Sequence, residues 1–265
     1  MSFTSIGLQK SLILLVFATY WLAGSLLTSW AAAGLIIAIG LIIWRYEATA
    51  YCSLFTLHAW FVIDSPLAMA NHHFVLMFLA LSLAICPLSR AHQKRRQSIR
   101  LMWIILMTLA AVHKILCFDF SNGSFLAYMF LYGGFGADFL HLFPSFYEQT
   151  IHNQQLLAAH SYPGDNTVIQ FQGPSMPYWF TVVAWLIIGL ELGLAYLAWK
   201  APNSPLFWGV AAGFLISLVL IRPELIFAAT LALMLFLHNP DQRKNWIFAL
   251  LCCLYCSMVW LDGWL

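Results

Sequence analysis

Two charged side chains stand inside long apolar runs of this sequence, where a charge is costly. Lys114 lies near the end of the run 101–117. It must reach the membrane surface, pair with a partner or lose its proton, and a neutral lysine is a usable base. Glu191 lies near the middle of the run 177–199. We expect it either to be protonated or to pair with a Lys, His or Tyr side chain.

Three neighbouring polar residues, Asn71-His72-His73, stand at the start of a further apolar run, 72–89. A histidine in this position commonly caps a helix or lies at the interface. Two neutral imidazoles and an amide beside a deprotonatable Lys114 can instead bind and activate a polar ring, such as a quinol. Adjacent helix positions face about 100° apart, so we expect no metal ion at this pair of histidines.

The composition requires a nonpolar surrounding for most of the chain. Of its 265 residues, 62% are hydrophobic and only 8% are charged. Soluble domains are roughly 25% charged, so a water-exposed surface cannot be built from this inventory. The net charge of +2 gives no reason to expect a nucleic-acid partner. The six cysteines lie in or beside apolar runs, so the C-x-x-C pair Cys253 and Cys256 is read as helix packing, with redox or metal chemistry as the alternative.

A bilayer core needs about 20 apolar residues per helix. On this scale the sequence predicts an all-α, polytopic integral membrane bundle, one transmembrane domain over 1–265 with about nine spans. The short spans 31–44, 50–63 and 223–238 can be half-helices or a tight hairpin. The predicted spans are 11–29, 31–44, 50–63, 72–89, 101–117, 177–199, 205–221, 223–238 and 246–261.

Basic residues orient the bundle. Five of the 12 Lys and Arg residues lie in the stretch Ser89–Arg100, whereas the interval Ile115–Trp199 contains none. The stretch is therefore expected in the cytoplasm together with the N-terminus, and the long segment 118–176 is expected outside. Within it, Phe125–Phe143 is read as an interfacial or re-entrant helix with a glycine hinge, and Glu148–Pro177 as a polar part with turns.

Several of these motifs resemble the membrane domain of vitamin K-dependent gamma-carboxylases and their bacterial relatives, the horizontally transferred transmembrane (HTTM) family. The segment Asn71–Leu76 is similar to the family's Asn-His-x-aromatic-Leu motif. The segment Ala110–Ile115 is similar to its Ala-Gly-x-x-Lys-Leu segment, which ends in the catalytic lysine. Asp119-Phe120 approximates an acidic-aromatic pair, and the helix with Glu191 resembles a family helix that has an acidic residue. The agreement covers about residues 10–240.

The resemblance implies a site near the outer membrane surface. Lys114 would be the weak base that takes a proton from vitamin K hydroquinone or another quinol, with His72 as its catalytic partner. Asn71, His73 and His113 would hold the ring, and Glu191 would be a structural or network acid. In the family, the resulting strong base abstracts the gamma proton of a substrate glutamate, and the carbanion captures carbon dioxide. No metal is expected at this site.

The chain departs from the family pattern in places that concern the reaction. A Phe-His pair of the family is replaced by Gly213-Phe214-Leu215, and a Ser-x-Asp segment by the basic stretch. No counterpart of the extramembrane domain that docks protein substrates is expected in this sequence. The function expected first is therefore quinol or hydrophobic-ligand binding with Lys114 as base, in a bacterial inner membrane and facing the periplasm. The alternative is a non-catalytic accessory or assembly subunit, with lipid and a membrane protein as partners.

Overall fold

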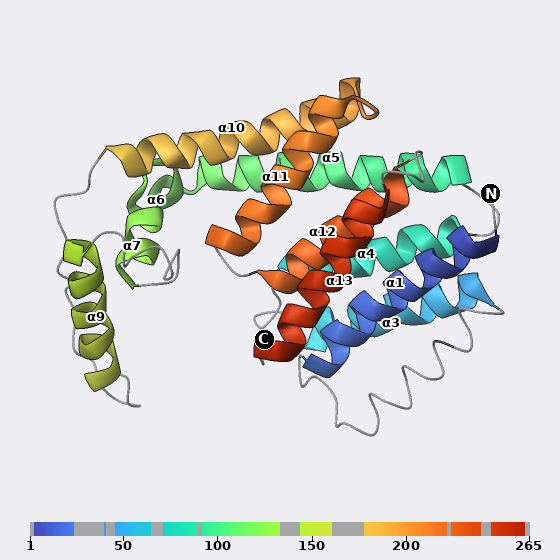
Figure 1. Cartoon of the computed structure of the whole chain (residues 1–265), viewed down its shortest axis with the longest axis horizontal. Coiled ribbons are helices and arrows are strands. Elements are labelled where there is room, and N and C mark those ends of the chain that lie inside the picture. The colour runs from blue at the N-terminus through green and yellow to red at the C-terminus, as the bar shows by residue number, and fades with distance from the viewer. Residues whose placement is uncertain are drawn as a thin grey trace. The chain divides into compact units, whose positions relative to one another are not determined.

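The fold is known from a computed structural model that describes residues 3–23, 40, 46–64, 71–88, 92–132, 144–160, 178–221, 224–239 and 245–262. The regular elements within these ranges are helices, as the composition predicts, and Figure 1 shows them in chain order. They are α1 (Phe3–Ala23), α3 (Glu47–Asp64), α4 (Asn71–Ile85), α5 (His92–Leu116), α6 (Phe118–Ser121), α7 (Ser124–Tyr132), α9 (Pro144–Ala159), α10 (Trp179–Lys200), α11 (Pro205–Ile221), α12 (Leu225–His238) and α13 (Asn245–Asp262).

Eight of the nine predicted spans overlap described helices, and the remaining one, 31–44, lies outside the described residues apart from residue 40. The helix predicted over 101–117 already begins at His92, so the basic stretch forms its first turns. The expected helix in Phe125–Phe143 is present as α7, while its glycine hinge lies outside the described part. Helix α9, a polar helix of 16 residues, was not predicted.

By length and composition, two of the described helices, α5 and α10, can cross a membrane. In their most apolar stretches of 18 residues, only 22% and 33% of the residues are buried. Most residues of these two stretches are therefore exposed or only partly buried. The other apolar helices within the described ranges are shorter, so the nine-span bundle remains a prediction.

The chain divides into two compact units, which are described separately. The first comprises Met1–Leu106, Leu197–Val219 and Glu224–Leu265, and the second comprises Met107–Tyr196 and Leu220–Pro223. The boundary falls within the helices α5 and α10, so each of these helices contributes residues to both units. The single transmembrane domain expected over 1–265 remains a prediction.

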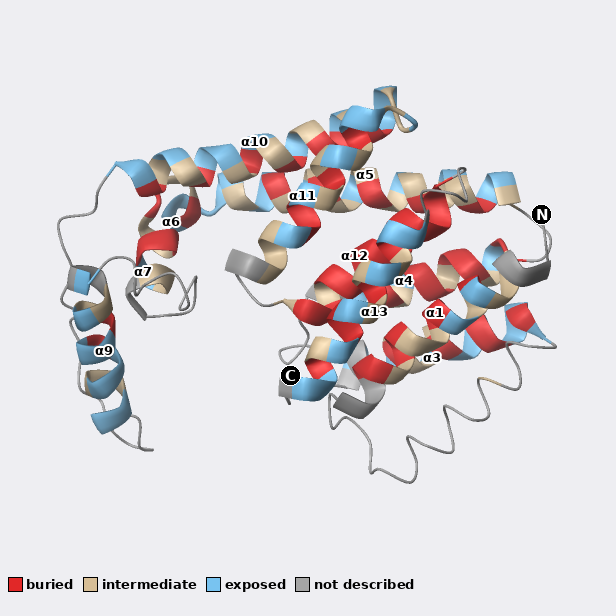
Figure 2. Cartoon of the chain, viewed as in Figure 1, coloured by how far each residue is buried: buried red, intermediate tan, exposed pale blue. Residues whose placement is uncertain are grey.

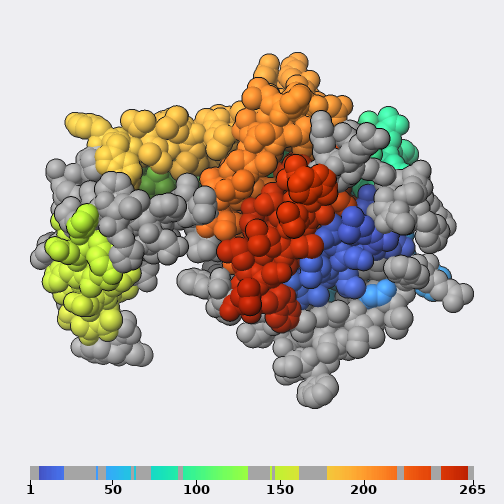
Figure 3. All heavy atoms as spheres, in the orientation of Figure 1, coloured from blue at the N-terminus to red at the C-terminus, as the bar shows by residue number. Residues whose placement is uncertain are grey.

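The first unit is built around α12. Thirteen of its 14 residues are buried, and Figure 2 shows it almost entirely in the colour for buried residues. It packs against α13, α1 and α4, and α4 in turn packs against α3. On the face seen in Figure 3, α13 lies beside α1. A helix that is apolar on all sides is stable only when it is enclosed, which explains why α12 occupies the centre.

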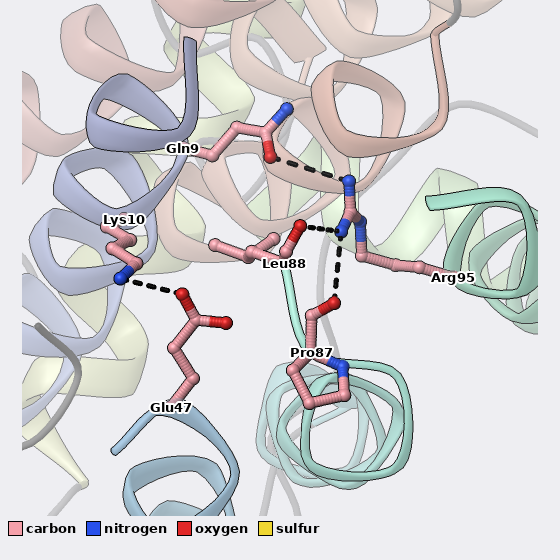
Figure 4. Close-up of polar contacts among 6 residues, drawn as sticks. All are labelled: Gln9, Lys10, Glu47, Pro87, Leu88 and Arg95. Carbon is pink, nitrogen blue, oxygen red and sulfur yellow. Dashed lines mark hydrogen bonds and ion pairs between the residues drawn. The ribbon is translucent and has the colours of Figure 1, made fainter. Parts of the chain in front are cut away.

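Arg95 lies at the basic end of the first unit with 1% of its surface exposed. Its guanidinium donates hydrogen bonds to the carbonyls of Leu88 (3.0 Å) and Pro87 (3.4 Å), just beyond the last turn of α4. It also donates to Gln9 Oε1 of α1 (3.5 Å), as Figure 4 shows. A further bond joins Arg95 to Nδ1 of His92 (2.7 Å). One buried cation therefore connects α1, the end of α4 and the start of α5.

Two other contacts hold the same end of the unit. Lys10 of α1 forms an ion pair with Glu47 of α3 at 2.6 Å, drawn beside Arg95 in Figure 4. The guanidinium of Arg100 donates to the carbonyls of Ala198 (2.8 Å) and Trp199 in the last turn of α10. These carbonyls have no partner within their own helix, so a cation there both satisfies them and complements the helix dipole.

Candidate functional site

The second unit contains an ion pair between its two longest helices. Nζ of Lys114, near the end of α5, lies 2.6 Å from Oε1 of Glu191, in the second half of α10. The side chain of Glu191 is 6% exposed and that of Lys114 is 23% exposed. The partner expected for Glu191 is therefore present, and it is the lysine that the sequence singled out.

The carboxylate of Glu191 is only partly satisfied by this pair. Its second oxygen, Oε2, is buried and has no hydrogen-bond partner among the residues that the structure describes. A carboxylate oxygen can accept more than one hydrogen bond, and a buried one left without a donor is costly. Oε2 is therefore an open acceptor for a hydroxyl or N–H group from a bound molecule.

Apolar and aromatic side chains form the surroundings of the pair. Nζ of Lys114 lies 5.5 Å from the ring centroid of Phe120 in α6, within range of a cation–π interaction. Phe120 belongs to a buried cluster to which α5, α6, α7 and α10 contribute. The buried members are Ala111, Phe120, Leu126, Ala127, Phe180, Ala184 and Ile188, and Phe125, Phe130, Val183 and Ile187 pack against them.

A tight turn connects α6 to α7 and positions Phe120. Gly123 has φ = +85°, a conformation that favours glycine. Asn122 Oδ1 accepts from the backbone N–H of Ser124 (2.8 Å), and the Asn122 carbonyl accepts from the Thr181 hydroxyl (2.6 Å). The turn thus lies directly on the first turn of α10. The turn was not predicted, because its Asn122-Gly123 pair lies in the outer segment 118–176, just before the stretch Phe125–Phe143 that was read as interfacial.

Replacing Gly123 with alanine is expected to destabilise this turn by about 1–3 kcal/mol. An added Cβ would lie 2.6 Å from the backbone nitrogen of Thr181 and 2.7 Å from the carbonyl carbon of Phe180, and the positive φ adds strain. The measurement is the thermal or denaturant midpoint of the purified protein in detergent. Gly189→Ala on α10 is the control, since a Cβ there meets nothing within 4 Å. Equal midpoints for the two variants would show that the turn does not require glycine.

The histidine motif lies in the other unit, on α4. His73 is buried, and its ring meets that of Tyr20 edge to face at 5.0 Å. Tyr20 also stacks on His58 of α3, with ring centroids 5.2 Å apart. The side chains of Asn71 and His72 lie outside the described part of the structure. Their roles, and the predicted convergence of this motif with Lys114, therefore remain predictions.

Tyr20 and His58 are polar ring residues that the sequence analysis missed, because each stands alone in an apolar run without a motif. Nδ1 of His58 donates to the carbonyl of Leu54 at 2.9 Å, so this imidazole has its proton on Nδ1 when neutral. Together with His73, the three rings form a buried aromatic cluster from α1, α3 and α4. His113, by contrast, is exposed beside Lys114 on α5.

The cysteines and the acidic residues that the structure describes show no arrangement typical of a metal centre. All six cysteines are free thiols, including Cys253 and Cys256 of the C-x-x-C pair. Within the described ranges, no three His, Cys, Asp or Glu side chains gather in a way that would hold an ion.

The comparisons with known proteins identify no relative. No protein-family model matches the chain, and neither a curated protein nor a solved structure is significantly similar to it. The functional argument therefore depends on the geometry of the site and on the sequence motifs.

Proposed function

We propose that this chain is an integral membrane protein that binds a quinol, or a related hydroxylated hydrophobic molecule, at the pair formed by Lys114 and Glu191. The observation that supports this most directly is the buried oxygen of Glu191, which has no donor among the described residues and lies beside an ammonium in apolar and aromatic surroundings. Pockets for small hydrophobic molecules commonly combine apolar walls with a few convergent polar groups. The resemblance to the HTTM family supports the same residue, Lys114.

Lys114 and Glu191 can together accept a proton from a ligand hydroxyl. The proton between Nζ of Lys114 and Oε1 of Glu191 can move to the carboxylate, because a dry site favours two neutral groups over two charges. Lys114 is then a neutral amine that accepts the hydroxyl proton of the ligand. At the end, Glu191 is a neutral carboxylic acid, Lys114 is an ammonium, and the ligand oxygen is an anion beside it.

The residues present suit a hydroquinone. Phe120 belongs to the buried cluster beside the ion pair, and Phe125 packs against this cluster, so both offer aromatic faces. Oε2 of Glu191 can orient a hydroxyl of the ligand. A hydroquinone of the vitamin K type would supply a hydroxyl whose deprotonation starts its reaction with oxygen. Following the family motif, His72 would assist Lys114, and Asn71, His73 and His113 would hold the ring. In this proposal the outer segment places the site on the periplasmic side of a bacterial inner membrane.

Lys114→Met is expected to weaken the binding of reduced vitamin K by at least about tenfold, because a charged, partly buried partner of the hydroxyl is lost. Binding to the purified protein is measured under nitrogen, with the dimethyl ether of the same hydroquinone as a ligand without the hydroxyl protons. The matched control is Lys94→Met, since Lys94 is exposed at the basic end of α5. Equal binding of hydroquinone and ether, or a loss with Lys94→Met as large as with Lys114→Met, would contradict the proposal.

Carboxylation itself is tested with reduced vitamin K, labelled bicarbonate and a glutamate-containing peptide. Incorporation that is lost in Lys114→Ala would extend the proposed function to a carboxylase. Incorporation that survives in Lys114→Ala would refute the assigned base.

A second candidate is a non-catalytic subunit of a membrane complex. The outward apolar faces of α5 and α10 favour it, because such faces can be covered by another membrane helix as well as by lipid. In that case the ion pair is only structural. Quinol binding would be absent in the natural chain, and the protein would be recovered in a larger complex from mild detergent.

A further inference from the structure

The first unit contains a small hollow that the proposed function does not use. It lies between α5, the last turn of α10, α11 and α12, and its walls include Ile99, Phe207, Met234 and Leu235. The lining also contains Ala198, the charged side chain of Arg100 and two polar side chains, Trp103 and His238. The free interior takes about one water-sized group.

Trp103 brings a hydrogen-bond donor to this hollow. It is 2% exposed, and its Nε1–H has no acceptor in the part of the chain that the structure describes. Its ring meets Phe207 edge to face at 6.2 Å, which fixes its orientation. An indole offers no other polar atom, so this buried side chain is left entirely without a hydrogen-bond partner among the described residues.

His238 brings an acceptor. Its Nδ1 lies 3.2 Å from the carbonyl of Arg96, and since a carbonyl can only accept, Nδ1 carries the proton. The neutral imidazole then presents a lone pair at Nε2, which is buried and has no donor within the described ranges. The ring stacks on Trp208 at 5.8 Å and 28°, so it is held in place.

A donor and an acceptor in a space of this size are matched by a water molecule or by a hydroxyl group. A hydroxyl oxygen accepts from the Trp103 N–H, while its proton is donated to Nε2 of His238. A ketone cannot donate, and an ammonium cannot accept. The apolar walls favour a hydroxyl attached to a hydrocarbon, whose remainder would lie toward the mouth of the hollow.

We propose that this hollow binds the hydroxyl group of a lipid-soluble alcohol or phenol. The site lies in the first unit, whereas Lys114 and Glu191 belong to the second, and the proposal does not rest on the proposed function. Arg100 at the lining already donates to the carbonyls of Ala198 and Trp199, so the donors in these two bonds are not directed at the ligand.

The test uses 4-hexylphenol and its methyl ether, 4-hexylanisole, with the purified full chain in detergent. We expect the phenol to bind about tenfold more tightly than the ether, and Trp103→Phe or His238→Phe to remove this difference. Trp185→Phe, an exposed tryptophan of α10, is the control and should leave the difference unchanged. The proposal is overturned if phenol and ether bind equally to the natural chain, or if both site variants retain the preference.

A second readout guards against variants that fold poorly. In the natural chain labelled with ¹⁵N-tryptophan, the indole N–H signal of Trp103 is expected to shift when the phenol is added, and to shift less at the same concentration of the ether. Trp103→Phe assigns the signal. A Trp103 signal that does not move during the phenol titration means that the hollow takes water only, and it overturns the proposal.

Discussion

Replacing Glu191 with leucine is expected to lower the free energy of unfolding by about 3 kcal/mol. The substitution leaves the ammonium of Lys114 without its partner beside an apolar cluster, and breaking a buried pair from one side costs roughly 3–5 kcal/mol. The lower end of that range applies because Lys114 is partly exposed and can turn toward the surface. Denaturant-induced unfolding in detergent measures the change.

The double variant Lys114→Met with Glu191→Leu is expected to recover most of this loss. Replacing both charges with apolar side chains removes the unpaired ion as well as the desolvation cost of the pair. Glu148→Leu, at an exposed position of α9 in the same unit, is the matched single-charge control and should change little. A double variant that is as unstable as the sum of the two single variants would show that the two residues are not coupled.

Arg95→Met is expected to produce the second large effect, a loss of about 2–4 kcal/mol in the first unit. The guanidinium satisfies the carbonyls of Pro87 and Leu88 and contacts Gln9, so its removal leaves several buried acceptors without a donor. A lysine cannot replace it, because a single ammonium lacks the planar fork of donors that reaches all three groups. Arg95→Lys is therefore expected to be destabilised as well.

Unfolding of Arg95→Met is compared with that of Lys94→Met. Lys94 carries the same charge one position earlier, but it is exposed. If the two variants unfold at the same midpoint, the basic stretch acts only through its charge, which is the role that membrane orientation requires. A lower midpoint for the Arg95 variant indicates that this residue also holds α1, α4 and α5 together.

The positions of eight described helices were predictable because each overlaps an apolar run of the sequence. Their ends were less predictable. Helix α5 begins at His92, and Arg95 and Arg100 in its first turns donate to carbonyls outside the helix; such bonds cannot be read from a run of basic residues. Helix α9 was missed because its residues show no strong apolar period, and it packs on α7.

The candidate site was predictable in part, because its two charged residues stand within apolar runs. A charge within an apolar run is conspicuous, so the sequence alone identifies Lys114 and Glu191 as candidates. Their contact across 77 positions of sequence was not determined by either run alone. The hollow beside Trp103 and His238 could not be predicted from the sequence, because single aromatic residues and a histidine at the end of a helix are common in apolar helices.

The central place of α12 has a consequence for the time course of synthesis. Helices α1 and α4 pack against it, yet about 200 residues separate the end of α1 from its first residue. At a synthesis rate of about 5–20 residues per second, that distance corresponds to a delay of about 10–40 s. During this interval the surfaces of α1 and α4 that α12 later covers remain exposed. The first unit therefore completes its core only near the end of translation, and a chain stalled before Leu225 is expected to need a chaperone or the insertion machinery to shield it.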